Sequence, residues 1–102
     1  MPLANLTQEQ QAAMYDIEER RERNLAEIAS LEQSDYRQFL MKRKNIRVQT
    51  EGSIRRFLTP EQRKIQDEAK VAERIAMSDL IKQYQQEGKS KEEIEMLLLE
   101  RG

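Results

Sequence analysis

Apolar residues recur every three or four positions along most of the chain, and this spacing predicts α-helices. A first helix is expected over residues 8–33, because Thr7 and Gln10 can form a capping box at its start. Five apolar residues then share one of its faces: Met14, Ile17, Leu25, Ile28 and Leu31. Ser34 and Asp35 break the pattern, and so short a link favours an antiparallel hairpin with the next helix.

The second expected helix, residues 36–57, is apolar on two sides. One side is expected to face the first helix and carries Tyr36, Phe39, Leu40, Ile46, Ile54 and Phe57. A second stripe on nearly the opposite side, here called the mixed stripe, alternates cations with apolar side chains: Arg37, Met41, Lys44, Val48 and Arg55. Because a helix that is apolar on two sides usually contacts two different things, the mixed stripe and Arg56 are the candidate surface for a neighbouring subunit, a client protein or a ligand.

A third helix begins with the strongest local signal in the chain. Thr59 caps it, Pro60 takes the first helical position, and Gln62 closes a second capping box. Its apolar face comprises Ile65, Ala69, Ala72 and Ala76, and then rotates to Met77, Leu80, Ile81 and Tyr84 before Gly88. Ser90 and Glu93 start a short fourth helix that should fold back on that second face. Met96 and Leu99 then remain as a candidate assembly patch.

These elements predict an all-α protein, an elongated antiparallel hairpin or bundle of three long helices plus a short C-terminal helix. Residues 1–76 would form its core and residues 77–102 a helical hairpin extension. Composition agrees, since 36% of the 102 residues are charged against about 25% in an average protein. Only 22 residues are Ile, Leu, Val or Phe, which suits narrow helical seams better than a compact sphere.

Charge is arranged in three blocks, although the formal net charge is −1. Residues 1–36 carry a net −5, residues 37–64 a net +7 and residues 65–102 a net −3. The cationic block can pair with its acidic neighbours or bind an anionic partner. Nucleic acid is disfavoured because the aromatic residues lie on the expected core face, and a membrane surface because the mixed stripe is too polar for deep insertion. A protein client or protein partner, in a homodimer or hetero-assembly, is preferred.

Catalysis, cofactors and metals are not expected. The chain has no His and no Cys, so it lacks an imidazole base, a thiolate nucleophile and the commonest zinc ligands. Acidic runs such as Glu18, Glu19 and Glu22 fit a solvated helix face. The longest unbroken apolar run, Met96–Leu99, is far below the roughly 20 residues that span a bilayer. We therefore expect a protein without enzymatic activity.

Two segments share the pattern Leu-Thr-x-x-Gln. The first is Leu6, Thr7 and Gln10, and the second, 52 residues later, is Leu58, Thr59 and Gln62. Each opens a helix, with a charged helical stretch between them. Over about residues 5–70 the chain thus resembles the LTxxQ (Spy/CpxP-like) family of small helical periplasmic proteins.

The resemblance implies an all-helical cradle, often dimeric, whose basic and partly apolar face holds unfolded clients without ATP. The mixed stripe would supply that face. It also implies a periplasmic location. The first residues do not have the pattern of an export signal, so this location would require that a signal has been removed. Otherwise the protein is expected in the cytoplasm. Residues 77–102 extend beyond the resemblance. Two alternatives stay open: an adaptor subunit of a larger assembly, and nucleic-acid binding by residues 36–57.

Overall fold

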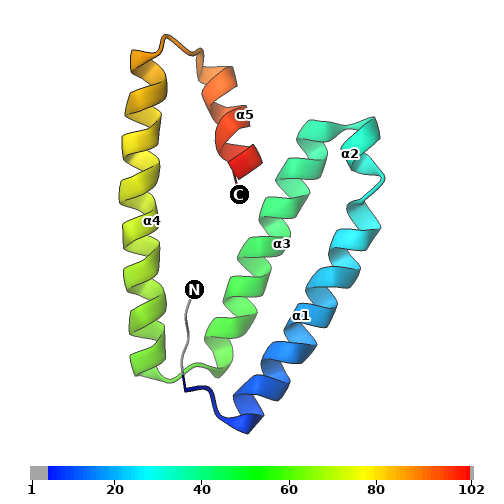
Figure 1. Ribbon diagram of the computed structural model, residues 1–102. Coiled ribbons are helices and arrows are strands. Elements are labelled where there is room, and N and C mark those ends of the chain that lie inside the picture. The colour runs from blue at the N-terminus through cyan, green and yellow to red at the C-terminus, as the bar shows by residue number, and fades with distance from the viewer. Residues whose placement is uncertain (1–4, 102) are drawn as a thin grey trace.

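The computed structural model describes residues 5–101, which form five helices and no strand (Figure 1). They are α1 (Gln8–Ile28), α2 (Leu31–Ser34), α3 (Tyr36–Phe57), α4 (Pro60–Gln86) and α5 (Lys91–Arg101). The molecule measures 49 × 33 × 15 Å with a radius of gyration of 16.3 Å, against about 13 Å for a compact domain of this length. The expected all-α class and elongated shape are confirmed.

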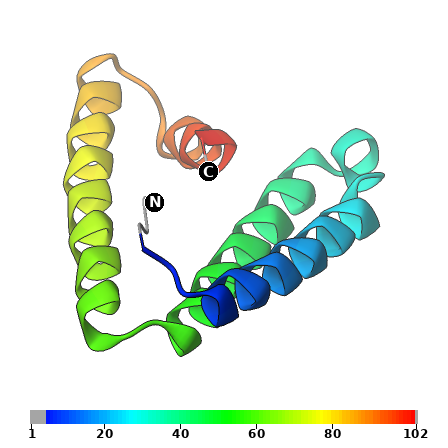
Figure 2. The same cartoon turned by 60° about the horizontal axis from the view of Figure 1, so that its bottom comes forward.

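The paired helices α1 and α3 hold most of the small core. They lie side by side in both views (Figures 1 and 2). Ile17 and Ile28 of α1 are buried, and Leu40 of α3 is only 1% exposed. Tyr36, which the pattern placed on the same buried side, is 43% exposed, because it lies at the first position of α3 beyond the end of α1.

The expectation of one continuous helix over residues 8–33 is wrong. Helix α1 ends at Ile28, and the short α2 follows. At the junction the backbone hydrogen bonds join residues three positions apart instead of four, as in a 3₁₀-helix. Ala29 N–H donates to the Ala26 carbonyl and Glu32 N–H donates to the Ala29 carbonyl, both at 3.3 Å. Apolar periodicity runs through such a junction without a break, so the pattern does not reveal it.

Helix α4 stands apart from the α1–α3 pair along most of its length (Figures 1 and 2). Its contacts with the rest of the chain are near its start, where it meets α1 and α3, and near its end, where it meets α5. The expected apolar face of Ile65, Ala69, Ala72 and Ala76 is therefore exposed. The proposed division after residue 76 falls inside this single continuous helix.

A tight turn after α4 returns the chain toward α3. Gly88 has a positive φ of 80°, Lys89 N–H donates to the Tyr84 carbonyl and Gly88 N–H to the Gln85 carbonyl, both at 3.1 Å. This bond pattern is a Schellman motif, which favours glycine at the left-handed position. Helix α5 then lies between α4 and α3 (Figure 1), with Ile94 buried and Met96 and Leu99 half-buried.

Candidate protein-binding surface

The two Leu-Thr-x-x-Gln motifs meet in space and join the starts of α1 and α4. In each motif the threonine hydroxyl accepts from the backbone N–H of the glutamine, at 3.1 Å for Thr7 and 3.2 Å for Thr59. Each glutamine Oε1 accepts in return from the threonine N–H, at 3.1 and 2.9 Å. Both expected capping boxes are thus confirmed.

The glutamines of the two motifs also pair with each other. Gln10 Nε2 donates to Gln62 Oε1 at 2.9 Å and to the Phe57 carbonyl at 3.1 Å, and Gln62 Nε2 donates back to Gln10 Oε1 at 3.3 Å. Gln10 and Leu58 are buried at this junction, while Leu6 is half-buried. The repeated motif therefore has a structural role, because it fixes where α4 leaves the α1–α3 pair.

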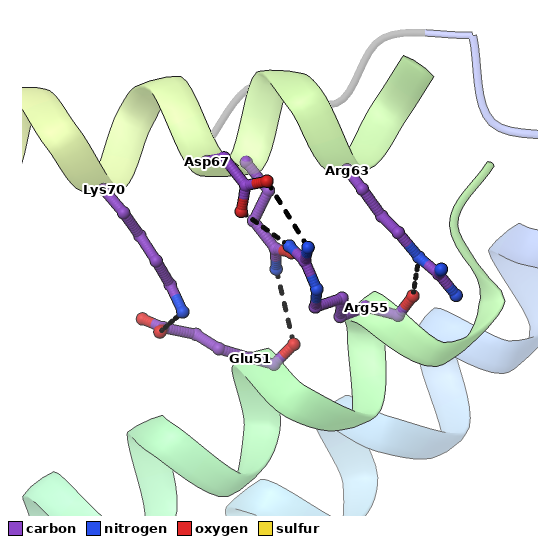
Figure 3. Close-up of polar contacts among 6 residues, drawn as sticks. Glu51, Arg55, Arg63, Asp67 and Lys70 are labelled. Atoms are coloured by element: carbon purple, nitrogen blue, oxygen red, sulfur yellow. Dashed lines mark hydrogen bonds and ion pairs between the residues drawn. The ribbon is translucent and has the colours of Figure 1, made fainter. Parts of the chain in front are cut away.

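A second set of polar contacts holds the corner between α3 and α4 (Figure 3). Arg55 Nη1 donates to Asp67 Oδ1 at 2.7 Å and to Gln66 Oε1 at 3.0 Å. Gln66 is only 2% exposed and donates to the Glu51 carbonyl at 3.3 Å. The hydrogen bond from Arg55 lowers the pKa of the Asp67 carboxyl below its ordinary value of 3.8.

Two further contacts complete this corner (Figure 3). Lys70 Nζ lies 3.7 Å from Glu51 Oε2, and Arg63 Nε donates to the Arg55 carbonyl at 3.0 Å. Arg55, one of the residues expected to bind a partner, is therefore engaged by the chain's own α4. These contacts between α3 and α4 are polar, so the angle of the corner depends on hydrogen bonds and charge as well as on the buried Leu58.

The mixed stripe is engaged at both ends and open in the middle. Arg37 forms an ion pair with Glu95 of α5 at 2.9 Å, as Arg55 does with Asp67 at the other end. Between them Met41 is 48% exposed and Val48 is 54% exposed, and Lys44 is exposed as well. Arg56 is exposed but lies about 100° from Arg55 around the helix, away from the stripe.

Beside the open part of the stripe lies a hollow of about 400 Å³. It is bounded by α3, by Met77 of α4, and by α5. Its lining combines Met41, Lys44, Asn45, Arg47, Met77, Glu95, Leu98 and Leu99. The hollow thus presents methionine and leucine side chains together with cations, which suits an apolar segment that carries carboxylates.

Sequence reasoning missed Arg43, which connects α3 to the end of α5. Its Nη2 donates to the Leu99 carbonyl at 3.0 Å and to the Glu100 carbonyl at 2.9 Å. Its guanidinium also lies 5.9 Å from the centre of the Phe39 ring. Partial desolvation and the nearby Glu100 raise the pKa of Tyr36 above its ordinary 10.0. Arg43 lies on the apolar stripe of α3, four residues after Phe39 and three before Ile46, so a cation inside an apolar face was the signal that could have singled it out.

Three other properties bear on what this surface can do. Among residues 5–101, no group of three acidic side chains is placed to share a metal ion. None of the helices in that range is long and apolar enough to cross a membrane. Comparisons with protein-family models, with curated proteins and with solved structures gave no match.

Proposed function

We propose that the protein holds exposed segments of other, non-native proteins on the open middle of the mixed stripe, without ATP, as a Spy-like chaperone of the periplasm. The observation that carries this proposal is the half-exposed pair Met41 and Val48 with the cation Lys44 between them. Contiguous exposed apolar patches rimmed by polar residues mark interaction sites, and Met41 continues into the apolar lining of the hollow. The paired motifs support the same family.

The chemistry of the surface favours a weak and adaptable grip. Met41 has a flexible, polarizable side chain that adjusts to apolar groups of different shape. Lys44 supplies a mobile charge for carboxylates, and its attraction weakens as salt screens it. The hollow beside the stripe gives room for side chains without requiring one fixed shape. Such a surface suits many clients, each bound briefly, better than a single permanent partner.

An aggregation assay tests the proposal directly. Reduced α-lactalbumin would be allowed to aggregate with an equimolar amount of the protein while light scattering is followed. We expect suppression by the wild type and about a ten-fold weaker effect of the variant Met41→Ser/Val48→Ser, since about 60 Å² of apolar contact is lost at about 25 cal/mol/Å². Val71→Ser, on the exposed face of α4, is the matched control. Equal protection by the double variant would contradict the proposal.

The exposed side of α4 favours a second candidate, a subunit of a homodimer or hetero-assembly. Three large apolar residues are exposed there, namely Ile65, Val71 and Ile75, the last at 60%. The bundle of three long helices expected from the sequence would then be completed by a helix of another chain. Sedimentation equilibrium at about 50 µM distinguishes the cases. A dimer that Ile75→Glu converts to monomer supports a homodimer, whereas a wild-type monomer excludes it.

A further inference from the structure

Helix α5 contacts α3 at its middle and at its C-terminal end. In its middle Glu95 pairs with Arg37 at 2.9 Å. At its end the carbonyls of Leu99 and Glu100 accept from Arg43 at 3.0 and 2.9 Å. A guanidinium at a helix C-terminus is favourable because the last carbonyls lack partners within the helix and carry partial negative charge.

The composition of α5 complements the surface beneath it. The helix KEEIEMLLLER has four glutamates and a run of three leucines. Its Glu95 pairs with Arg37 of the block of net charge +7, and Leu98 and Leu99 line the hollow together with Met41. Helix α5 is therefore itself an example of the kind of segment that the surface of α3 accommodates.

The seat of α5 is nevertheless loose. Both partners of the Arg37–Glu95 pair are about half exposed, and such a pair contributes little to stability. The hollow of about 400 Å³ remains between α5 and α3, and Arg43 Nε is buried with no hydrogen-bond partner among the described residues. A helix of 11 residues is marginal in water by itself. These features indicate that α5 can separate from α3.

We propose that α5 is a tethered, displaceable occupant of the α3 surface, and that this surface selects acidic, leucine-rich helical segments of other proteins, which bind in its place. The inference rests on the proposed function and names the class of client segment. A segment that takes the place of α5 can bind only the molecules in which α5 is released, so its apparent affinity is the intrinsic affinity multiplied by that released fraction.

The test uses the full chain and a fluorescein-labelled peptide of residues 90–101 as the competing segment. Glu95→Lys places a cation beside Arg37 and should release α5. The matched control is Glu68→Lys, the same charge change at an exposed residue of α4 that makes no ion pair within residues 5–101. By fluorescence anisotropy we expect Glu95→Lys to bind the peptide at least three-fold more tightly than the wild type or the control.

A distance measurement reports the release of α5 independently. The chain has no cysteine, so nitroxide labels can be placed on Lys42→Cys and Glu92→Cys, both exposed. The label distance should lengthen in Glu95→Lys and in the wild type at 0.5 M NaCl, with a loss of helix content by circular dichroism no larger than the 11 residues of α5. An unchanged distance in both cases, or a longer distance with unchanged or weaker peptide binding, would overturn the inference.

Two further results separate this inference from the function on which it rests. A peptide with its four glutamates replaced by lysine should bind at least ten-fold more weakly, and equal binding would contradict the selection for acidic segments. If the peptide displaces α5 but reduced α-lactalbumin still aggregates, the chaperone function fails and the displacement stands. If aggregation is suppressed but Glu95→Lys does not strengthen peptide binding, the displacement fails and the chaperone function stands.

Discussion

The paired glutamines of the two motifs offer a sharp test of how the fold is held. Gln10→Ala removes the bond to the Thr7 N–H, the bond to the Phe57 carbonyl and both bonds with Gln62. A hydrogen bond contributes about 0.5–1.5 kcal/mol net, and a buried group left without a partner costs about 1–3 kcal/mol. Since Thr7 is exposed and can turn to water, we expect a loss of about 2 kcal/mol, or about 10 °C in Tm.

A conservative substitution of Gln10 separates its contribution to the helix cap from its contribution to the hydrogen bonds between helices. Gln10→Glu keeps an oxygen for the Thr7 N–H but loses the Nε2 donor to Gln62 and Phe57. Glutamate is a good residue in a capping box, so a protein held by capping alone would be unaffected. We expect Gln10→Glu instead to be destabilised by at least about 1 kcal/mol at pH 7, because its carboxylate would face two acceptors.

The assay is urea unfolding followed by far-UV circular dichroism, with the m-value compared between variants. The control is Gln8→Ala, an exposed position in the same turn, which should change stability by less than about 0.5 kcal/mol. A double-mutant cycle of Gln10 and Gln62 to alanine should give a coupling of about 1 kcal/mol. A coupling near zero, or a Gln10→Glu variant as stable as the wild type, would refute the pairing.

Further predictions concern Gly88, Gly52 and the α3–α4 corner. Gly88→Ala should destabilise by about 1 kcal/mol in thermal unfolding, because the left-handed backbone at φ 80° strains any L side chain. Gly52→Ala, inside α3 with open space around an added Cβ, should stabilise by about 0.5–1 kcal/mol, and the opposite order would contradict the backbone argument. Because the pKa of Asp67 is lowered in the folded state, its contribution is present above pH 3.8 and is lost as pH falls through the lower folded value. Asp67→Asn should therefore flatten the acid limb of stability against pH, and an unchanged limb would exclude the Arg55 contact.

Much of the helical structure could be predicted because its signals are local. Capping boxes at Thr7 and Thr59 place the starts of α1 and α4 at the expected residues, and Gly88 marks the turn after α4. Each of these signals depends on hydrogen bonds between residues three to five positions apart. The apolar pattern did not predict the break after Ile28, because the break changes the backbone hydrogen bonds without changing the spacing of apolar residues.

The tertiary arrangement was harder to predict because periodicity says which face is apolar and not what covers it. The face of Ile65, Ala69, Ala72 and Ala76 has the pattern of a buried stripe, yet it is exposed. The meeting of Gln10 with Gln62, and the bonds from Arg43 to the end of α5, join residues more than 45 positions apart. The open middle of the mixed stripe, by contrast, lies where the two-sided pattern of α3 indicated.

Chemical-shift mapping of the ¹⁵N-labelled protein with reduced α-lactalbumin observes the binding surface directly. If non-native segments bind at the middle of the mixed stripe, the amide signals of Met41, Lys44 and Val48 will shift or broaden together, while those of Glu19 and Glu22 on the exposed side of α1 will not. Perturbation confined to α1 or to the outer face of α4, with the signals of residues 41–48 unmoved, would contradict the proposed role of this surface.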